Sequence, residues 1–215
     1  MTELWSERAE AYRAAPDQRE GADLDLVVEW CGPREGVQAL DVATGGGHVA
    51  RRLREGGATV TTVDPAPGMR ADVIARAEDL PFADDSFDVA VTRIAPHHFD
   101  DVGVAVRELA RVSRELVVVE DTLFVSEGIE RAEQLRDPTH VRSYTEVEWR
   151  GFVDGAGLVL EAVETFEKRR PLERWLERTG CVGEEAERVR GLLGAQIQDG
   201  QYVDTKLVLR ARKKR

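Results

Sequence analysis

The stretch Ala39–Arg51, ALDVATGGGHVAR, decides the fold of this chain. It predicts a short apolar strand over residues 38–42, a glycine-rich turn, and a helix over about residues 48–55. Glycine lets the main chain adopt a positive φ and lets a ligand approach it without a Cβ in the way. The N-terminus of a helix adds unpaired N–H groups and a partial positive charge. Together these elements predict a nucleotide-type binding site at the carboxyl end of a sheet.

Two classes of ligand fit this turn. The spacing Gly45-x-Gly47-x-x-Ala50 matches the dinucleotide fingerprint, with the acidic residue Asp64 at the end of the next strand. However, Asp41 precedes the first glycine by four residues, and a carboxylate there suits a cationic ligand group rather than a pyrophosphate. In this respect the stretch resembles motif I of class I S-adenosylmethionine (SAM)-dependent methyltransferases. A nicotinamide-dependent oxidoreductase remains the alternative.

Strands and helices alternate along the rest of the chain, which predicts an α/β sheet with helices on both faces. The family resemblance implies a Rossmann-like, seven-stranded, mostly parallel sheet with strand order 3-2-1-4-5-7-6 and strand 7 antiparallel. Only about eight residues join the strands expected at 58–63 and 72–76, fewer than a parallel crossover usually takes. We therefore expect a helix of about one turn around residues 67–71, or an irregular crossover. The later strands are expected at 87–92, 115–120, 159–167 and 205–212, and the later helices at 101–111, 126–136, 145–156, 172–179 and 184–198.

Composition narrows the functional classes. A chain of 215 residues with 42% hydrophobic content suits one domain with a full core. We divide it into a helical cap (1–36), a SAM-binding half (37–120) and a substrate-side half (121–215). A net charge of −11 argues against binding nucleic acid. No apolar run approaches the ~18 residues of a membrane span, so we expect a cytoplasmic protein without membrane contact, as a monomer or homodimer.

The resemblance also assigns parts of SAM to positions of this chain. It implies that Gly45 and Gly47 let the backbone approach the methionine end of SAM. Asp64 would accept the two ribose hydroxyls, because an ionised carboxylate has spare lone pairs on both oxygens; otherwise it is a surface turn residue. The N-terminal AEAY segment extends the resemblance and implies that Tyr12 closes over SAM as a lid. The full implied set is Tyr12, Asp41, Ala43, Thr44, Gly45, Gly47, Asp64, Pro65, Met69, Ala77, Glu78, Asp79, Arg93 and Ile94.

The adenine end departs from the family pattern. The stretch AEDLPF, residues 77–82, matches a family motif that normally begins with an aspartate, and that aspartate aligns with Arg76. Either Glu78 or Asp79 would then accept the adenine amino group, or the adenine would rest on the Ala77 N–H. The resemblance implies that Pro65 and Met69 form an apolar edge beside the adenine.

The stretch DDSFDVAVTRIAPHH, residues 84–98, resembles the region where strand 4 reaches the reaction centre of methyltransferases related to the ubiquinone/menaquinone C-methyltransferases. This implies that Arg93 and Ile94 lie beside the methionine part of SAM. His97 and His98 follow where substrate and sulfonium would meet. A histidine there can accept a proton from the nucleophile, or it caps or satisfies the core. We predict no metal site, because no third ligand stands at a suggestive spacing, although folding can bring in His140.

These features predict a SAM-dependent methyltransferase that acts on a small molecule and releases S-adenosylhomocysteine (SAH). Methyl transfer is a direct displacement, so alignment and exclusion of water are the main tasks of the protein. The alternative within the same fold is a SAM- or SAH-binding protein without turnover. Arg76 and the shortened connection motivate this alternative, since both can weaken the adenine pocket.

Overall fold

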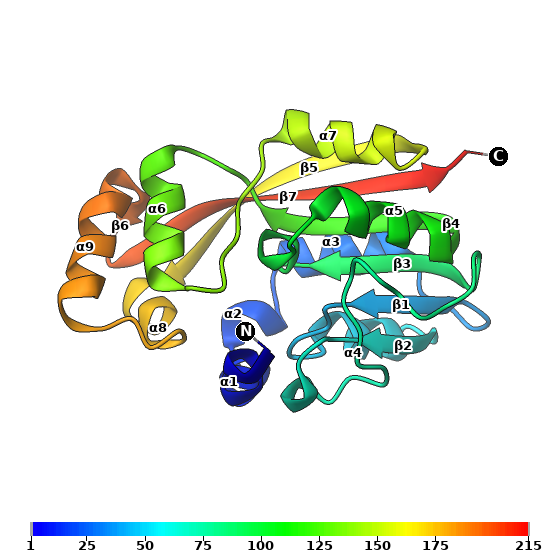
Figure 1. Ribbon diagram of the computed structural model, residues 1–215, viewed down its shortest axis with the longest axis horizontal. Coiled ribbons are helices and arrows are strands. Elements are labelled where there is room, and N and C mark those ends of the chain that lie inside the picture. Colours follow the sequence, from blue (N-terminus) through cyan, green and yellow to red (C-terminus); the bar gives the residue numbers. More distant parts are fainter. Residues whose placement is uncertain (1, 215) are drawn as a thin grey trace.

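One seven-stranded sheet runs through the computed structural model, which describes residues 2–214 (Figure 1). The strand order is β2-β1-β3-β4-β7-β5, and the short strand β6 pairs with β7. β7 runs antiparallel to both of its long neighbours, whereas β2, β1, β3 and β4 are parallel. The predicted α/β fold class is therefore confirmed. The strands are Gln38–Val42 (β1), Thr59–Val63 (β2), Phe87–Arg93 (β3), Ser113–Thr122 (β4), Leu158–Pro171 (β5), Ile197–Gln198 (β6) and Gln201–Lys213 (β7).

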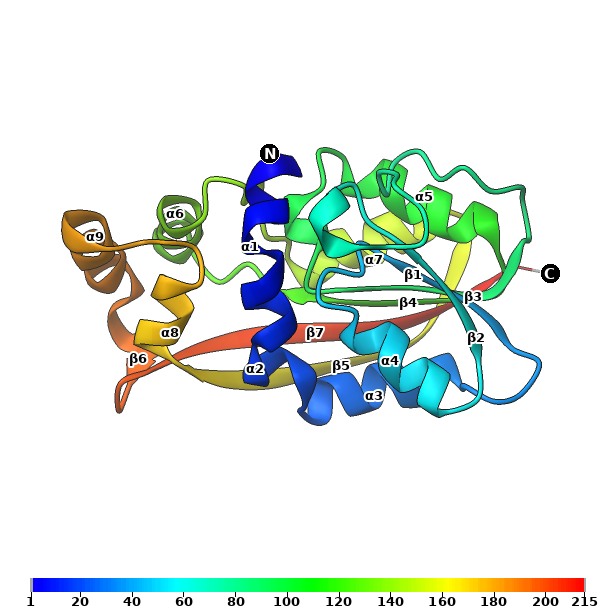
Figure 2. The same ribbon diagram turned by 90° about the horizontal axis from the view of Figure 1, so that it is seen from below.

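Helices cover both faces of this sheet (Figure 2). Helices α3 (Ala22–Cys31) and α4 (His48–Glu55) lie on one face, and α5 (Val102–Val112) and α7 (Glu146–Gly155) lie on the other. The two faces bury separate hydrophobic clusters, and the run Val117–Val119 between them is at most 1% exposed. Such a continuous apolar run is typical of a strand covered on both sides.

A third cluster lies beyond the main sheet, at the far ends of the long strands β5 and β7 (Figure 1). It is built by α6 (Glu127–Arg136), α8 (Leu172–Glu177) and α9 (Gly183–Leu193). Trp175 and Tyr202 are buried at its centre with ring centroids 4.4 Å apart. Among the described helices, none combines the length and the apolar character that crossing a bilayer requires.

The strand predicted at residues 72–76 is wrong. After β2 the chain forms one 3-10 turn at Pro67–Met69, which matches the shortened helix we expected. It then forms a single parallel bridge with β2, between Val63 and Val73. The Asp72 carboxylate accepts hydrogen bonds from the Thr62 N–H (2.9 Å) and the Thr62 hydroxyl (2.7 Å). This side chain takes the N–H that a ladder pair before Val73 would need. Beyond Val73 the next ladder pair would need the Ala66 N–H, which donates to the Asp64 carboxylate instead (2.9 Å), so the edge pairing is limited to one bridge.

Helix α1 (Thr2–Ala14), followed by the single turn α2 (Pro16–Arg19), faces the carboxyl ends of β1, β2 and β3 (Figures 1 and 2). On one side the Ser6 hydroxyl accepts a hydrogen bond from the Gly68 N–H (3.0 Å). On the other side Trp5 donates to the Thr139 hydroxyl (3.1 Å), and Arg8 forms an ion pair with Asp137 (3.1 Å). Helix α1 therefore bridges two loops of the sheet and covers the space between them.

Candidate functional site

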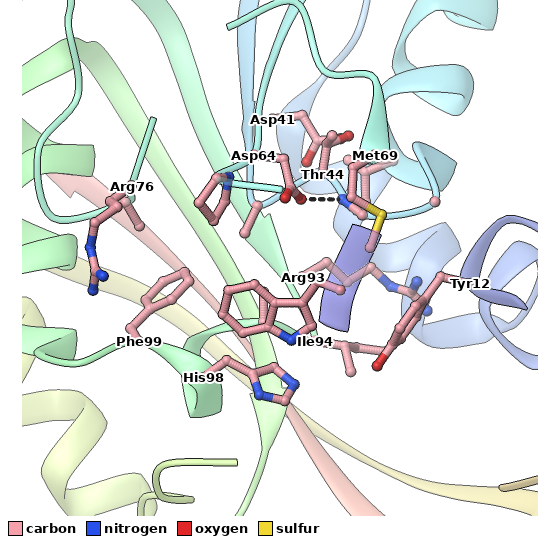
Figure 3. A pocket seen from close by; sticks show the side chains of 18 of the residues that line it. Tyr12, Asp41, Thr44, Asp64, Met69, Arg76, Arg93, Ile94, His98 and Phe99 are labelled. Carbon is pink, nitrogen blue, oxygen red and sulfur yellow. Dashed lines mark hydrogen bonds between the residues drawn. The ribbon is translucent and has the colours of Figure 1, made fainter. Parts of the chain in front are cut away.

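A cavity of about 180 Å³, which we call the turn cavity, lies where β1, β2 and β3 end (Figure 3). Parallel strands present their carboxyl ends at the same edge, so the residues that follow them meet there. Helix α1 closes the cavity with Trp5 and Tyr12. The lining residues are Thr2, Trp5, Tyr12, Gln18, Asp41, Ala43, Thr44, Gly45, Gly46, His48, Val49, Asp64, Pro65, Met69, Arg76, Ala77, Glu78, Arg93, Ile94, Ala95, His98, Phe99 and Asp100.

Asp41 supports the glycine turn from beneath. Its Oδ2 accepts hydrogen bonds from the Thr44 hydroxyl (2.6 Å) and the Ala50 N–H (3.1 Å), which joins β1 to the first turn of α4. Burial raises the pKa of Asp41 to about 6, although these two hydrogen bonds oppose the rise. Asp41 therefore carries a negative charge at neutral pH beside the cavity.

Asp64 ends β2 with its carboxylate directed to the glycine turn (Figure 3). Its Oδ2 accepts from the Gly45 N–H (3.0 Å), and its Oδ1 accepts from the Ala66 N–H (2.9 Å). Each oxygen keeps one further lone pair. Burial raises the pKa of Asp64, and the two backbone hydrogen bonds lower it. The side chain is thus a fixed double acceptor rather than a free surface turn residue.

The three glycines of the turn have different structural roles. Gly45 lines the cavity with a positive φ of 52°. Gly46 also lines it, and a Cβ added there would lie 2.9 Å from the Tyr12 carbonyl oxygen. Gly47, a predicted cofactor residue, does not line the cavity; its φ of 74° lets the chain enter α4 instead. Among residues 2–214, no acceptor bonds the N–H groups of Gly46 and His48.

Two non-glycine residues at the cavity wall have left-handed backbones. Ala43 follows β1 with φ 55°, and Ile94 follows β3 with φ 52°. Such conformations disfavour residues with a Cβ and gather at functional sites when the surrounding structure enforces them. Here the Thr44 N–H donates to the Val63 carbonyl (3.0 Å), and the Ile94 N–H donates to the Glu120 carbonyl (2.8 Å). Neighbouring strands therefore hold both residues in place.

The predicted adenine end lies at the mouth of the turn cavity. Pro65, Met69, Ala77 and Glu78 line it, whereas Asp79 does not. Arg76, which stands where the family has an aspartate, also lines the cavity (Figure 3). Its guanidinium pairs with Asp100 (2.6 Å) and with Glu78 (3.3 Å) on the half-exposed rim. The Ala77 N–H has no acceptor within residues 2–214, so it is open to a ligand.

Arg93 lines the turn cavity at the end of β3, but its guanidinium forms ion pairs with residues that do not line this cavity. It pairs with Glu120 (2.6 Å) and Asp23 (2.6 Å) and donates to the Gln18 carbonyl (3.1 Å). Lys168 also pairs with Asp23 (2.5 Å). Burial raises the pKa of Glu120 to about 7. This buried network anchors α2 and α3 to the sheet and fixes the cavity wall next to Ile94.

The structure separates the two candidate histidines. His98 lines the turn cavity, and its Nδ1 lies 2.9 Å from the Thr139 carbonyl oxygen. Because a carbonyl only accepts, Nδ1 carries the proton and Nε2 keeps its lone pair. His97 does not line the turn cavity; its Nδ1 contacts Asp121 at 2.5 Å. Burial lowers the pKa of each histidine to about 3, so both are neutral at physiological pH.

Several lining residues escaped the sequence analysis. Trp5 and Gln18 come from the N-terminal helices, and Phe99 comes from the turn after His98. His48, in the first turn of α4, also lines the cavity and contacts the Tyr12 carbonyl oxygen (3.0 Å). The AEAY segment indicated that the N-terminal helix takes part in the site, but it identified only Tyr12 as a lining residue.

Comparisons with known proteins identify the family of this chain. Residues 40–116 match the family model described as a methyltransferase domain. The uncharacterized methyltransferase YcgJ of Bacillus subtilis is 31% identical over 208 residues, which cover 86% of this chain and 82% of YcgJ.

Solved structures agree in fold. The crystal structure of YcgJ superposes with a TM-score of 0.80 at 24% identity, covering 90% of this chain and 98% of that one. A Bacillus halodurans protein gives a TM-score of 0.81 at 24% identity, covering 91% and 100%. Because the match to YcgJ extends over most of both sequences, the chain belongs to the class I SAM-dependent methyltransferase family.

Proposed function

We propose that this protein binds SAM in the turn cavity and transfers its methyl group to a small molecule. The observation that carries the proposal is Asp64: a buried carboxylate at the end of β2, held by two backbone N–H groups, with one lone pair left on each oxygen. Two neighbouring hydroxyls, such as those of a ribose, are the natural partners of such a double acceptor.

The rest of the cavity suits the other parts of SAM. The open N–H groups of the turn and the nearby Asp41 carboxylate offer opposite charges to a ligand end that carries both an ammonium and a carboxylate. Pro65 and Met69 supply apolar surface for the adenine, and the Ala77 N–H supplies a donor. Where the family pattern has a single acidic residue, this chain has Arg76 in ion pairs with Glu78 and Asp100. We include the ubiquinone/menaquinone C-methyltransferase branch in the proposal because Arg93 and Ile94 lie at the end of β3 beside the turn cavity, where that branch places them.

Bound SAM would supply an electrophilic methyl group whose leaving sulfur is already activated by its positive charge. The residues of this chain orient the reactants and exclude water. Helix α1 covers the cavity with Trp5 and Tyr12, and Ile94 packs at the end of β3. His98 presents an unprotonated Nε2 to the turn cavity and is the candidate general base; because burial lowers its pKa to about 3, Nε2 is a weak proton acceptor and alignment carries more of the catalysis.

The test is calorimetric titration of the protein with SAH, repeated with Asp64→Ala and Asp72→Ala. Asp72 is a matched control, because it is also a carboxylate bound to β2 but does not line the cavity. We expect Asp64→Ala to weaken SAH binding by at least about tenfold, the loss of one or two hydrogen bonds to a charged group, and Asp72→Ala to leave it unchanged. Equal affinity in all three proteins would refute the assignment of Asp64.

A second candidate function is SAM or SAH binding without turnover, which the Arg76 substitution at the adenine end favours. The discriminating assay follows release of SAH from SAM with a panel of hydroxyl, amine and carbon acceptors. Tight SAH binding without acceptor-dependent release would select the binding protein. Binding of NADH in place of SAH would select the oxidoreductase alternative.

A further inference from the structure

A second cavity, which we call the charged cavity, lies directly behind the turn cavity. The two share four lining residues: Tyr12, Gln18, Ile94 and His98. Its far wall comes from α6, α8 and the long strands β5 and β7, and cationic side chains gather there: Arg136, Arg170, Arg178 and Lys206. The two cavities thus adjoin at the end of β3, beside Ile94 and His98.

Two of these cations keep unused hydrogen-bond donors. Arg170 directs Nη2 to both oxygens of Asp204 (2.7 and 2.8 Å), while its Nε is buried and has no acceptor among the described residues. Arg178 binds Asp17 through Nη2 (2.5 Å), and within residues 2–214 its remaining guanidinium N–H groups have no partner. A buried donor such as the Arg170 Nε–H is unfavourable unless a ligand or water completes its hydrogen bonds, whereas Arg178 is half-buried and lines the cavity with its free N–H groups.

The acidic side chains of this wall are already engaged. Glu133 accepts from Arg136 (3.2 Å) and from the Tyr202 hydroxyl (2.9 Å), and Asp137 accepts from Arg8 (3.1 Å). Their charges are compensated by partners within the protein. Asp204 is engaged in the same way, by Arg170 and Lys206. Apart from the Nε2 lone pair of His98, the free hydrogen-bonding capacity of the charged cavity therefore lies in the donors of its arginines.

The size of the charged cavity limits what it can hold. Its volume is about 40 Å³, and a single water needs roughly 10–15 Å³ measured in this way. It has room for a group of about three heavy atoms rather than for a whole acceptor molecule. A planar carboxylate has that size, and its two oxygens match the parallel donors of a guanidinium.

We propose that the charged cavity binds the carboxylate of the methyl acceptor, which makes the acceptor a carboxylate-bearing small molecule. Arg170 and Arg178 hold the carboxylate, and the atom that receives the methyl group extends past Ile94 and His98 into the turn cavity. This inference rests on the proposed function and adds the substrate class to it.

The experiment uses the full chain saturated with SAH and titrated with matched acids and amides. The probes are lactate, 3-hydroxybutyrate and 4-hydroxybenzoate, each paired with its neutral amide. We expect at least one acid to bind about tenfold or more tightly than its amide. Arg178→Gln should abolish this preference and Arg178→Lys should retain part of it. Arg174→Gln should leave it intact, because Arg174 is exposed on the same helix and lines neither cavity.

Removing Arg178 leaves Asp17 without its ion-pair partner, so the double variant Asp17→Asn/Arg178→Gln tests the preference without an unpaired charge. Equal binding of acids and amides, no binding of any acid, or a preference that survives in both Arg178→Gln variants would overturn the inference. SAH affinity, measured first on the same samples, separates the two proposals. Absence of SAH binding defeats the proposed function, whereas SAH binding without acid preference defeats only the carboxylate site.

Discussion

Gly46 is a position where the addition of a single methyl group should disturb helix α1, which covers the turn cavity. A Cβ at this position would lie 2.7 Å from His48 Nε2 and 2.9 Å from the Tyr12 carbonyl oxygen. The φ of Gly46 is outside the left-handed region, so the backbone itself accepts alanine. The entire effect of Gly46→Ala must therefore come from lack of space beneath α1.

The expected magnitude follows from these contacts. Ordinary van der Waals contact begins at 3.4 Å, so the Tyr12 carbonyl must retreat by about half an ångström. It is part of the helix backbone and cannot rotate away, and its 3.0 Å contact with His48 would break. Overpacking costs about 1–3 kcal/mol and a lost hydrogen bond about 0.5–1.5 kcal/mol. We expect a loss of about 2–3 kcal/mol, located at α1.

Amide hydrogen exchange measures this loss where it occurs. Helix α1 can detach without unfolding the sheet, so exchange over residues 2–14 should accelerate by roughly 30- to 150-fold. SAH affinity should fall as the cover opens. The control is Gly47→Ala, where no atom lies within 4 Å and only the positive φ opposes a side chain. Unchanged exchange over residues 2–14 in Gly46→Ala would refute the reasoning.

Three further predictions concern stability. His98 has a folded pKa of about 3, against 6.5 when unfolded, so below pH 6.5 the unfolded chain binds the additional proton and stability falls as the pH falls. Between pH 7.5 and pH 5, wild type should therefore lose about 2 kcal/mol relative to His98→Asn in urea unfolding; a constant difference between the two proteins would contradict the assigned environment. Thr145→Ala removes the capping box with Glu148 at the start of α7 and should lower stability by about 1 kcal/mol in thermal unfolding, and an unchanged melting temperature would argue against the cap. Gly151→Ala lies in the middle of α7 with no atom within 4 Å of the added Cβ, so it should raise stability by up to about 1 kcal/mol; a decrease would contradict the helix there.

Local patterns were enough to predict most of the framework. The glycine turn between β1 and α4 has short-range signals: an apolar strand, three glycines and a helix start, all within residues 38–55. Asp64 follows the next strand directly, so parallel pairing alone brings it to the same edge. The start of α7 is a short-range feature as well, because its capping box joins Thr145 and Glu148, three residues apart.

The prediction of a strand at 72–76 failed for a reason that no local pattern contains. Strand formation there depends on whether the neighbouring edge offers free N–H groups, and the Asp72 and Asp64 side chains take those of Thr62 and Ala66. Side-chain competition for a backbone donor becomes visible only when both segments are in place. The same holds for Gly46, whose requirement for glycine arises from the approach of Tyr12.

The sequence by itself determined the class of fold, the family and the glycine turn that points to SAM. All three can be recognised from short motifs and from the alternation of strands and helices, which involve residues close along the chain. Tertiary structure alone decided which residues close the site. Trp5 meets Thr139 and Lys206 meets Thr122 across more than 80 positions, and such pairs have no periodicity or spacing of their own. That His98 lines both cavities while His97 lines only the charged cavity, and that Arg170 and Arg178 keep unused donors, likewise follows from how distant helices pack around the ends of the strands.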